Sequence, residues 1–220
     1  MRSIVALCLL ALLTGCAGAA VPAGSSPADE LADAARRLVD SGGFTFVVER
    51  DGPALSLDAL PGLGVEGASG TFVVPDRAAG DVAGRLGPLG ASVPFVAVGA
   101  DLWITNPLDG GWERFDATEV IDLPVLLGPE GLAAYLGTDV GGVVLEPIDV
   151  GSAYRGEFDT TGLAAATNGI IGAGVVALRG TIDLDGVLAT AVFDDPVETG
   201  VVWRFSFADP GAEAVIEPPA

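Results

Sequence analysis

Short apolar runs with the two-residue period of a β-strand recur along most of this 220-residue chain. In residues 44–49, for example, Phe44, Phe46 and Val48 alternate with the residues between them, as in a strand with one face buried. Comparable runs occupy residues 67–74, 92–99, 102–105, 143–148, 153–158, 176–184, 187–194 and 201–207. Turn residues separate most of these runs. The pattern predicts a meander of about nine antiparallel strands.

A helix precedes the strands, and shorter helices interrupt them. Residues 26–29 place a serine before a proline and an aspartate three positions after the serine, which is typical of a helix start. Apolar residues then recur at helical spacing until Gly42 and Gly43 end the helix. Residues 118–137, broken at Gly128-Pro129, and residues 163–168 predict further short helices. Helices gathered around one antiparallel sheet make this an α+β fold.

The N-terminus predicts a bacterial lipoprotein signal. Arg2 precedes an apolar run at residues 4–13, which is shorter than the roughly 20 residues of a membrane-spanning helix. The run ends in a lipobox, Leu13-Thr14-Gly15-Cys16. We expect residues 1–15 to be a signal peptide, 16–25 the lipidated Cys16 and a flexible tether, and 26–220 a single folded domain. The protein would then be lipid-anchored at the cell membrane and face the extracytoplasmic, periplasmic space.

Composition excludes several classes of function. Ten arginines are the only basic side chains against 30 carboxylates, which gives a formal net charge of −20. Such a chain offers no basic surface for nucleic acid. It contains no histidine, Cys8 leaves with the signal, and Cys16 carries lipid, so we expect no catalytic residues, no cofactor and no metal site.

Two acidic motifs have simpler explanations than catalysis or metal binding. Asp194-Asp195 precedes a proline, and neighbouring strand residues point to opposite faces, so we expect a solvated turn. Asp183-Leu184-Asp185-Gly186 resembles the start of a calcium loop but lacks the acidic residue that would follow downstream. A hairpin turn at Asp185-Gly186 accounts for it.

Several strands are apolar on both faces. In residues 95–98, Phe95 and Ala97 alternate with Val96 and Val98. A sheet with one solvated face alternates more cleanly. Either the strands are buried in a well-packed core or one face lines an apolar cavity.

The order and spacing of several short segments resemble the LppX/LprA/LprF/LprG family of actinobacterial, chiefly mycobacterial, lipoproteins. The segments are Leu60-Pro61-Gly62, Ala68-Ser69-Gly70-Thr71-Phe72, residues 96–105 ending in Leu102-Trp103-Ile104-Thr105, Gly111-Trp112-Glu113-Arg114-Phe115, residues 126–137, Tyr154-Arg155-Gly156-Glu157 and Glu217-Pro218-Pro219. The resemblance implies a strongly curved antiparallel sheet, a half-barrel like that of LolA and LolB. Helices on its concave side would enclose an apolar cavity.

The resemblance also implies a function. A membrane-anchored, non-enzymatic protein would carry acylated lipids or lipoglycans across the periplasm toward the outer envelope, with a membrane lipid exporter as a further partner. The alternation along the strands then predicts which residues line the cavity. They are Phe46, Val48, Phe72, Val74, Val96 and Val98 from the sheet, and Leu127, Leu132 and Leu136 from the helices. The acidic composition favours a neutral lipid. The alternative is a non-carrier envelope lipoprotein with a filled core, acting as an interaction module for a transporter, a cell-wall enzyme or a receptor.

Overall fold

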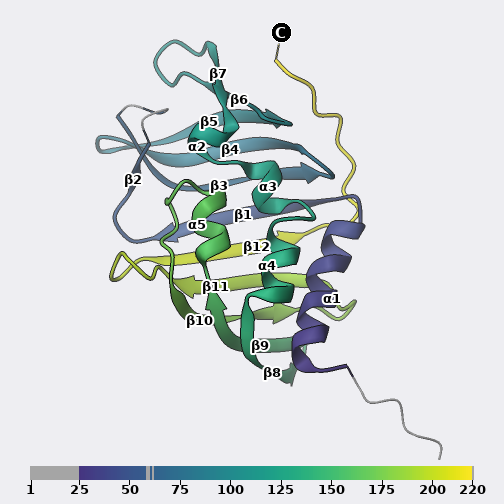
Figure 1. The fold of residues 1–220 in the computed structure, drawn as a ribbon. Coiled ribbons are helices and arrows are strands. Elements are labelled where there is room, and N and C mark those ends of the chain that lie inside the picture. The colour runs from purple at the N-terminus through teal and green to yellow at the C-terminus, as the bar shows by residue number, and fades with distance from the viewer. Residues whose placement is uncertain (1–24, 58–59, 61, 220) are drawn as a thin grey trace, which may run out of the picture.

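The computed structural model describes residues 25–57, 60 and 62–219, without the side chains of Glu119, Pro124 and Leu132. The predicted signal and Cys16 lie outside the described residues. One antiparallel sheet and five helices make up the described part (Figure 1). None of the helices within it is long and apolar enough to cross a bilayer.

The sheet runs continuously through eleven strands, in the order β7-β6-β5-β4-β3-β1-β12-β11-β10-β9-β8, and β2 pairs with β3 beside this path. The strands are β1 (Gly43–Asp51), β2 (Leu55–Ser56), β3 (Leu63–Val73), β4 (Arg77–Leu86), β5 (Leu89–Val98), β6 (Asp101–Thr105), β7 (Trp112–Asp116), β8 (Val140–Ile148), β9 (Gly151–Asp159), β10 (Val175–Ile182), β11 (Leu188–Asp194) and β12 (Val202–Ala208). β1 and β12 are neighbours in the middle, with Phe46 opposite Phe207. The first and last described strands therefore form the centre of the sheet.

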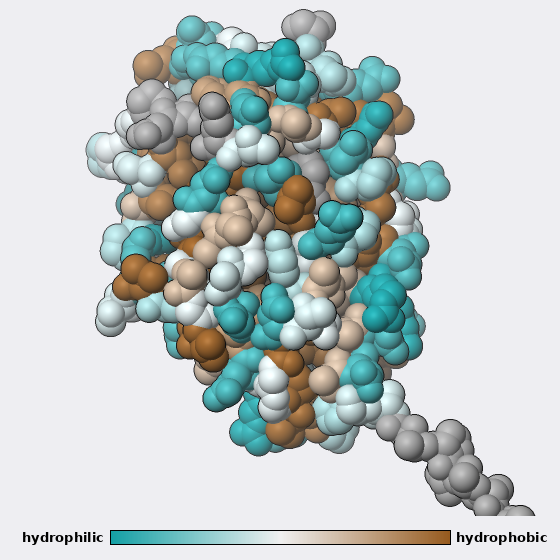
Figure 2. Space-filling view, viewed as in Figure 1, coloured by the Kyte–Doolittle hydropathy of each residue, from teal (hydrophilic) through white to brown (hydrophobic). Residues whose placement is uncertain are grey.

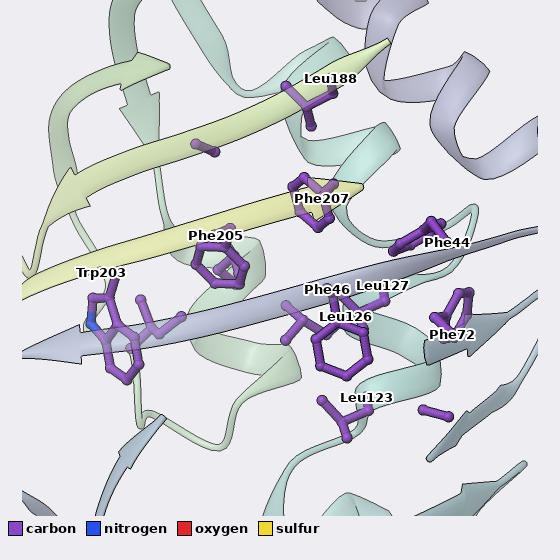
Figure 3. Packing of buried hydrophobic residues seen from close by; sticks show 14 of the residues in the cluster. Phe44, Phe46, Phe72, Leu123, Leu126, Leu127, Leu188, Trp203, Phe205 and Phe207 are labelled. Atoms are coloured by element: carbon purple, nitrogen blue, oxygen red, sulfur yellow. The ribbon is translucent and has the colours of Figure 1, made fainter. Parts of the chain in front are cut away.

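The helices lie on one face of the sheet, which we call the helix-covered face; the other is the open face (Figure 1). They are α1 (Pro27–Asp40), α2 (Ala117–Val120), α3 (Leu123–Leu127), α4 (Leu132–Thr138) and α5 (Thr161–Ala166). Aromatic side chains of the central strands fill the space beneath them (Figure 3). The ring of Phe44 lies 5.3 Å from that of Phe72 and 5.7 Å from that of Phe207. These contacts make the helix-covered face the main hydrophobic core.

Local sequence explains α1. The hydroxyl of Ser26 accepts a hydrogen bond from the backbone N–H of Asp29 at 3.2 Å, and the Asp29 carboxylate accepts one from the Ser26 N–H at 3.1 Å. This capping box, with Pro27 at the first helical position, satisfies donors that the helix start leaves free. Leu31, Ala34, Ala35, Leu38 and Val39 are buried on one side. The helix predicted from residue 26 is confirmed.

All nine predicted strands are present, and the α+β class is confirmed. The short helices predicted in residues 118–137 appear as α2, α3 and α4, with Gly128-Pro129 between α3 and α4. The predicted hairpin turn is also confirmed, since the carboxylate of Asp183 accepts hydrogen bonds from the N–H groups of Asp185 and Val187.

Sequence periodicity missed β2, β4 and β7. β4 is rich in glycine and alanine, so its sequence lacks the alternation of large apolar residues that marks a strand. The glycines are required by packing: a Cβ atom at Gly80 would lie 1.9 Å from the Ser69 carbonyl oxygen of β3. β7 was missed for another reason, because Trp112, Glu113 and Arg114 are exposed at the sheet edge.

Candidate functional site

An apolar pocket lies between the helix-covered face and the α2–α3 segment. Its sheet side includes Val48, Val82, Phe95, Ile104 and Trp203, and its helix side includes Val120, Ile121, Leu123, Leu126 and Ile170. Leu55, Leu57 and Leu60, from β2 and the segment after it, close a further side. The pocket has a volume of about 90 Å³. Pockets for small molecules usually measure about 300–1,000 Å³, so this pocket is narrow.

One charged residue stands in this hydrocarbon lining. Along β1, the side chains of every second residue point to the same face of the sheet. Arg50 continues the series Phe44, Phe46 and Val48, so its side chain faces the helices, and it lines the pocket. It is 7% exposed. Its guanidinium lies 5.7 Å from the centre of the Trp203 ring, close enough for a cation–π contact.

The hydrogen bonding of Arg50 is incomplete. Its Nη2 donates to the carboxylate of Glu198, a side chain that is half exposed. Its Nε and Nη1 are buried and find no acceptor among the described residues. Burying polar groups without partners is costly, so Arg50 is the most unusual side chain of the pocket.

A buried carboxylate holds Trp203 in place. Asp195 is 8% exposed and accepts a hydrogen bond from Nε1 of Trp203 at 3.0 Å. Its carboxylate also accepts from the backbone N–H groups of Val197, Glu198 and Gly172. Burial acts to raise the pKa of Asp195, but these hydrogen bonds hold its pKa below the ordinary value. Asp194 is exposed as expected, whereas the prediction of a solvated turn was wrong for Asp195.

Seven of the nine predicted lining residues divide into three groups. Val48 lines the pocket. Phe46, Phe72, Leu127 and Leu136 are buried in the surrounding core, and half-buried Val74 packs against it. The side chain of Leu132 lies outside the described part of the chain.

Val96 and Val98 require a correction. Phe95 and Ala97 are buried with the core, so alternation along β5 turns Val96 and Val98 toward the open face. They do not line the pocket. β5 is apolar on both faces, and its sequence alone does not distinguish the buried face.

A larger hollow of about 580 Å³ lies over β1, β3 and β12 at the open face. Its charged lining residues are Glu49, Arg50, Asp51, Glu66 and Arg204, so Arg50 borders both this hollow and the apolar pocket. The Arg204 Nε lies 3.5 Å from the Glu49 carboxylate. Charged lining groups do not suit hydrocarbon, so this hollow is a poor site for acyl chains.

The helix side of the molecule presents a mixed surface, with polar residues around scattered apolar ones (Figure 2). One of the exposed apolar side chains is Val125 of α3. Within the residues described, no three His, Cys, Asp or Glu side chains come together as a metal site.

Comparison with solved structures identifies the architecture. The chain superposes on LprF from Mycobacterium bovis with a TM-score of 0.65 at 17% identity, covering 88% of this chain and 97% of that one. The chain has the LppX-type fold. It matches Mycobacterium tuberculosis lipoprotein LppX itself with a TM-score of 0.59 and 17% identity, over 88% of this chain and 100% of LppX.

The LppX-type fold was expected from the order of short motifs along the sequence, and the superpositions confirm it. No sequence-family model matches the chain, and no curated protein matches it either. At 17% identity the likeness to LprF and LppX is one of fold.

Proposed function

We propose that this protein binds an acylated lipid between the α2–α3 segment and the helix-covered face, and carries it across the periplasm toward the outer envelope. The observation that supports this most is the hydrocarbon lining of the pocket, which both the sheet and the helical segment provide. The LppX-type fold supports the same function, as does the lipobox that ends at Cys16.

The volume of the pocket bears on how a lipid would enter. About 90 Å³ is too little for a long acyl chain, since pockets for drug-sized ligands already measure about 300–1,000 Å³. Binding therefore requires the α2–α3 segment to move away from the sheet. α2 and α3 have four and five residues, and helices this short depend on packing for their stability. In this proposal the sheet is the fixed, half-barrel wall and the short helices form the movable one.

The first experiment is native mass spectrometry of the full chain carrying Cys16→Ser, which lacks the predicted acylation site. The protein would be produced in a lipid-rich actinobacterial host, and its bound molecules would be extracted and identified. Co-purifying diacyl or triacyl lipid supports the carrier. A protein without bound lipid that also fails to take up lipid from vesicles favours the interaction module.

A larger side chain inside the pocket should block binding. Val82→Phe adds a ring to a half-buried lining position. If a bound acyl chain meets the same overpacking cost as a protein core, about 1–3 kcal/mol, lipid binding should weaken by about 5- to 150-fold. Val96→Phe on the adjacent strand is the control, because this side chain faces away from the pocket. Titration with a fluorescent acyl lipid measures both. Equal binding by the two variants would contradict the assigned pocket.

A further inference from the structure

We propose that the ligand of this pocket carries an anionic oxygen group next to its acyl chain, and that Arg50 binds this group. The inference rests on the proposed function and names the class of lipid: a fatty acid carboxylate or the phosphodiester of a phospholipid. Both present the same chemistry, a negatively charged oxygen attached to hydrocarbon.

The first argument is the chemistry of Arg50. A guanidinium stays protonated at all physiological pH values and has five N–H donors. Only Nη2 has a partner, while Nε and Nη1 are buried and lack an acceptor within the described residues. An anionic oxygen reaching the end of the pocket would supply the missing acceptor, and hydrogen bonds between charged groups are among the strongest in proteins.

The second argument is that Arg50 is held in a fixed place. The Trp203 ring packs against its guanidinium, and Asp195 fixes that ring by accepting the hydrogen bond from Nε1. The N–H groups of Val197 and Glu198 bind the same carboxylate. One short loop thereby holds both the tryptophan beneath Arg50 and the Glu198 that pairs with it. A site whose donors are already positioned loses little conformational entropy when a ligand binds.

The third argument is electrostatic. The protein as a whole is strongly acidic. Among its described residues, Arg50 and Asp195 are the only charged residues that are buried. Asp195 is already bound by four donors, whereas Arg50 has two nitrogens to spare. The half-exposed Glu198 pairs with one edge of the guanidinium, and Nε and Nη1 stay without a partner in a residue that borders an apolar pocket. The neutral lipid favoured by overall composition does not satisfy this local charge.

The test compares charged and neutral ligands of matched hydrocarbon. The full chain carrying Cys16→Ser is titrated with palmitate and hexadecanol, and with phosphatidylglycerol and diacylglycerol, by displacement of a neutral pyrene-labelled acylglycerol. We expect each anionic ligand to bind 10- to 100-fold more tightly than its neutral counterpart, the range that charged hydrogen bonds provide. Inorganic phosphate, the free anion, should not displace the probe at millimolar concentration. Displacement by phosphate alone would overturn the assignment to an acyl-linked group.

Arg50→Met removes the charge but keeps an unbranched apolar side chain, and should abolish the preference while retaining binding of hexadecanol. Arg204→Met is the matched control, because Arg204 lies beside Trp203 on β12 and faces the other way. It should keep the preference. A second variant, Glu198→Gln, removes the competing negative charge at a half-exposed side chain and should strengthen palmitate binding several-fold, which tests the site even if Arg50→Met does not fold.

The outcomes separate the two proposals. Equal binding of charged and neutral ligands by the protein with Arg50 intact overturns the role of Arg50 and leaves the lipid carrier standing. Failure of all four lipids, and of the pyrene-labelled probe, to bind overturns both. A preference that survives Arg50→Met also overturns the assignment, since the charge would then be recognised elsewhere.

Discussion

Asp195→Asn is expected to lower the free energy of unfolding by about 3 kcal/mol. The two carboxylate oxygens of Asp195 divide four donors between them: Oδ1 accepts from Val197 and Glu198, and Oδ2 accepts from Gly172 and Trp203. An asparagine keeps one oxygen and presents an NH₂ group to the other two donors. Two buried donors then lose their acceptor, which costs about 1–3 kcal/mol each. Urea denaturation followed by circular dichroism measures the loss.

Asp194→Asn is the matched control, because Asp194 is exposed and precedes Asp195 in the chain. It should change the free energy of unfolding by less than about 0.5 kcal/mol. Similar losses in the two variants would show that the buried hydrogen bonds of Asp195 do not stabilise the fold.

The effect of Asp195 should also depend on pH. Its pKa is lowered in the folded protein, so its charged form stabilises the fold above the unfolded-state pKa of about 3.9, and this contribution disappears as the pH falls through the folded-state value. The difference in stability between the wild type and Asp195→Asn should therefore be constant from about pH 5 to 7 and shrink below about pH 4. A difference that grew in acid would contradict the lowered pKa.

Gly80→Ala is expected to destabilise the protein by about 2–3 kcal/mol, although it adds only one methyl group. A Cβ at this position would lie 1.9 Å from the Ser69 carbonyl oxygen and 2.6 Å from the Gly70 Cα. Both are backbone atoms of β3, which no change of rotamer can move aside. β3 and β4 would have to separate along part of their length, and the hydrogen bonds between them would lengthen. Urea denaturation again measures the loss.

Gly90→Ala in the neighbouring strand β5 provides the comparison. A Cβ at Gly90 has no heavy atom within 4 Å, so the methyl group has room. We expect a change within about 0.5 kcal/mol, because the substitution also reduces the freedom of the unfolded chain. If Gly80→Ala were equally mild, the close approach of β3 and β4 would not be a requirement of the fold.

Much of the fold could be predicted because its strands carry large apolar residues on the buried face. β1 is the clearest case, with Phe44, Phe46 and Val48 in alternation. β4 could not be predicted in this way, since its close contact with β3 demands glycine where a strand pattern would show a large residue. Periodicity detects strands that bury large side chains and misses those that pack backbone against backbone.

The site was less predictable than the fold. Arg50 has the parity of the buried residues before it, and extending the alternation by one step would have placed it inside. This signal is easily overlooked, because arginine side chains are rarely buried in proteins. Asp195 offers no such signal, because its partners come from residues 172, 197, 198 and 203 and meet only in the folded chain. Val96 and Val98 failed for a different reason. β5 is apolar on both faces, and such a sequence does not reveal which face the helices cover.

The central position of β1 and β12 has a consequence for how the chain folds. Their pairing joins the first and last described strands, so it closes the longest loop in the sheet and has a high entropic cost. Folding rates fall as contacts become more distant in sequence. Until β12 has been synthesised, β1 lacks one of its two neighbours, and Phe44 lacks the edge-on contact with Phe207. An incomplete chain therefore cannot form the middle of its sheet, and the complete pairing of β1 has to wait until the last strand is present.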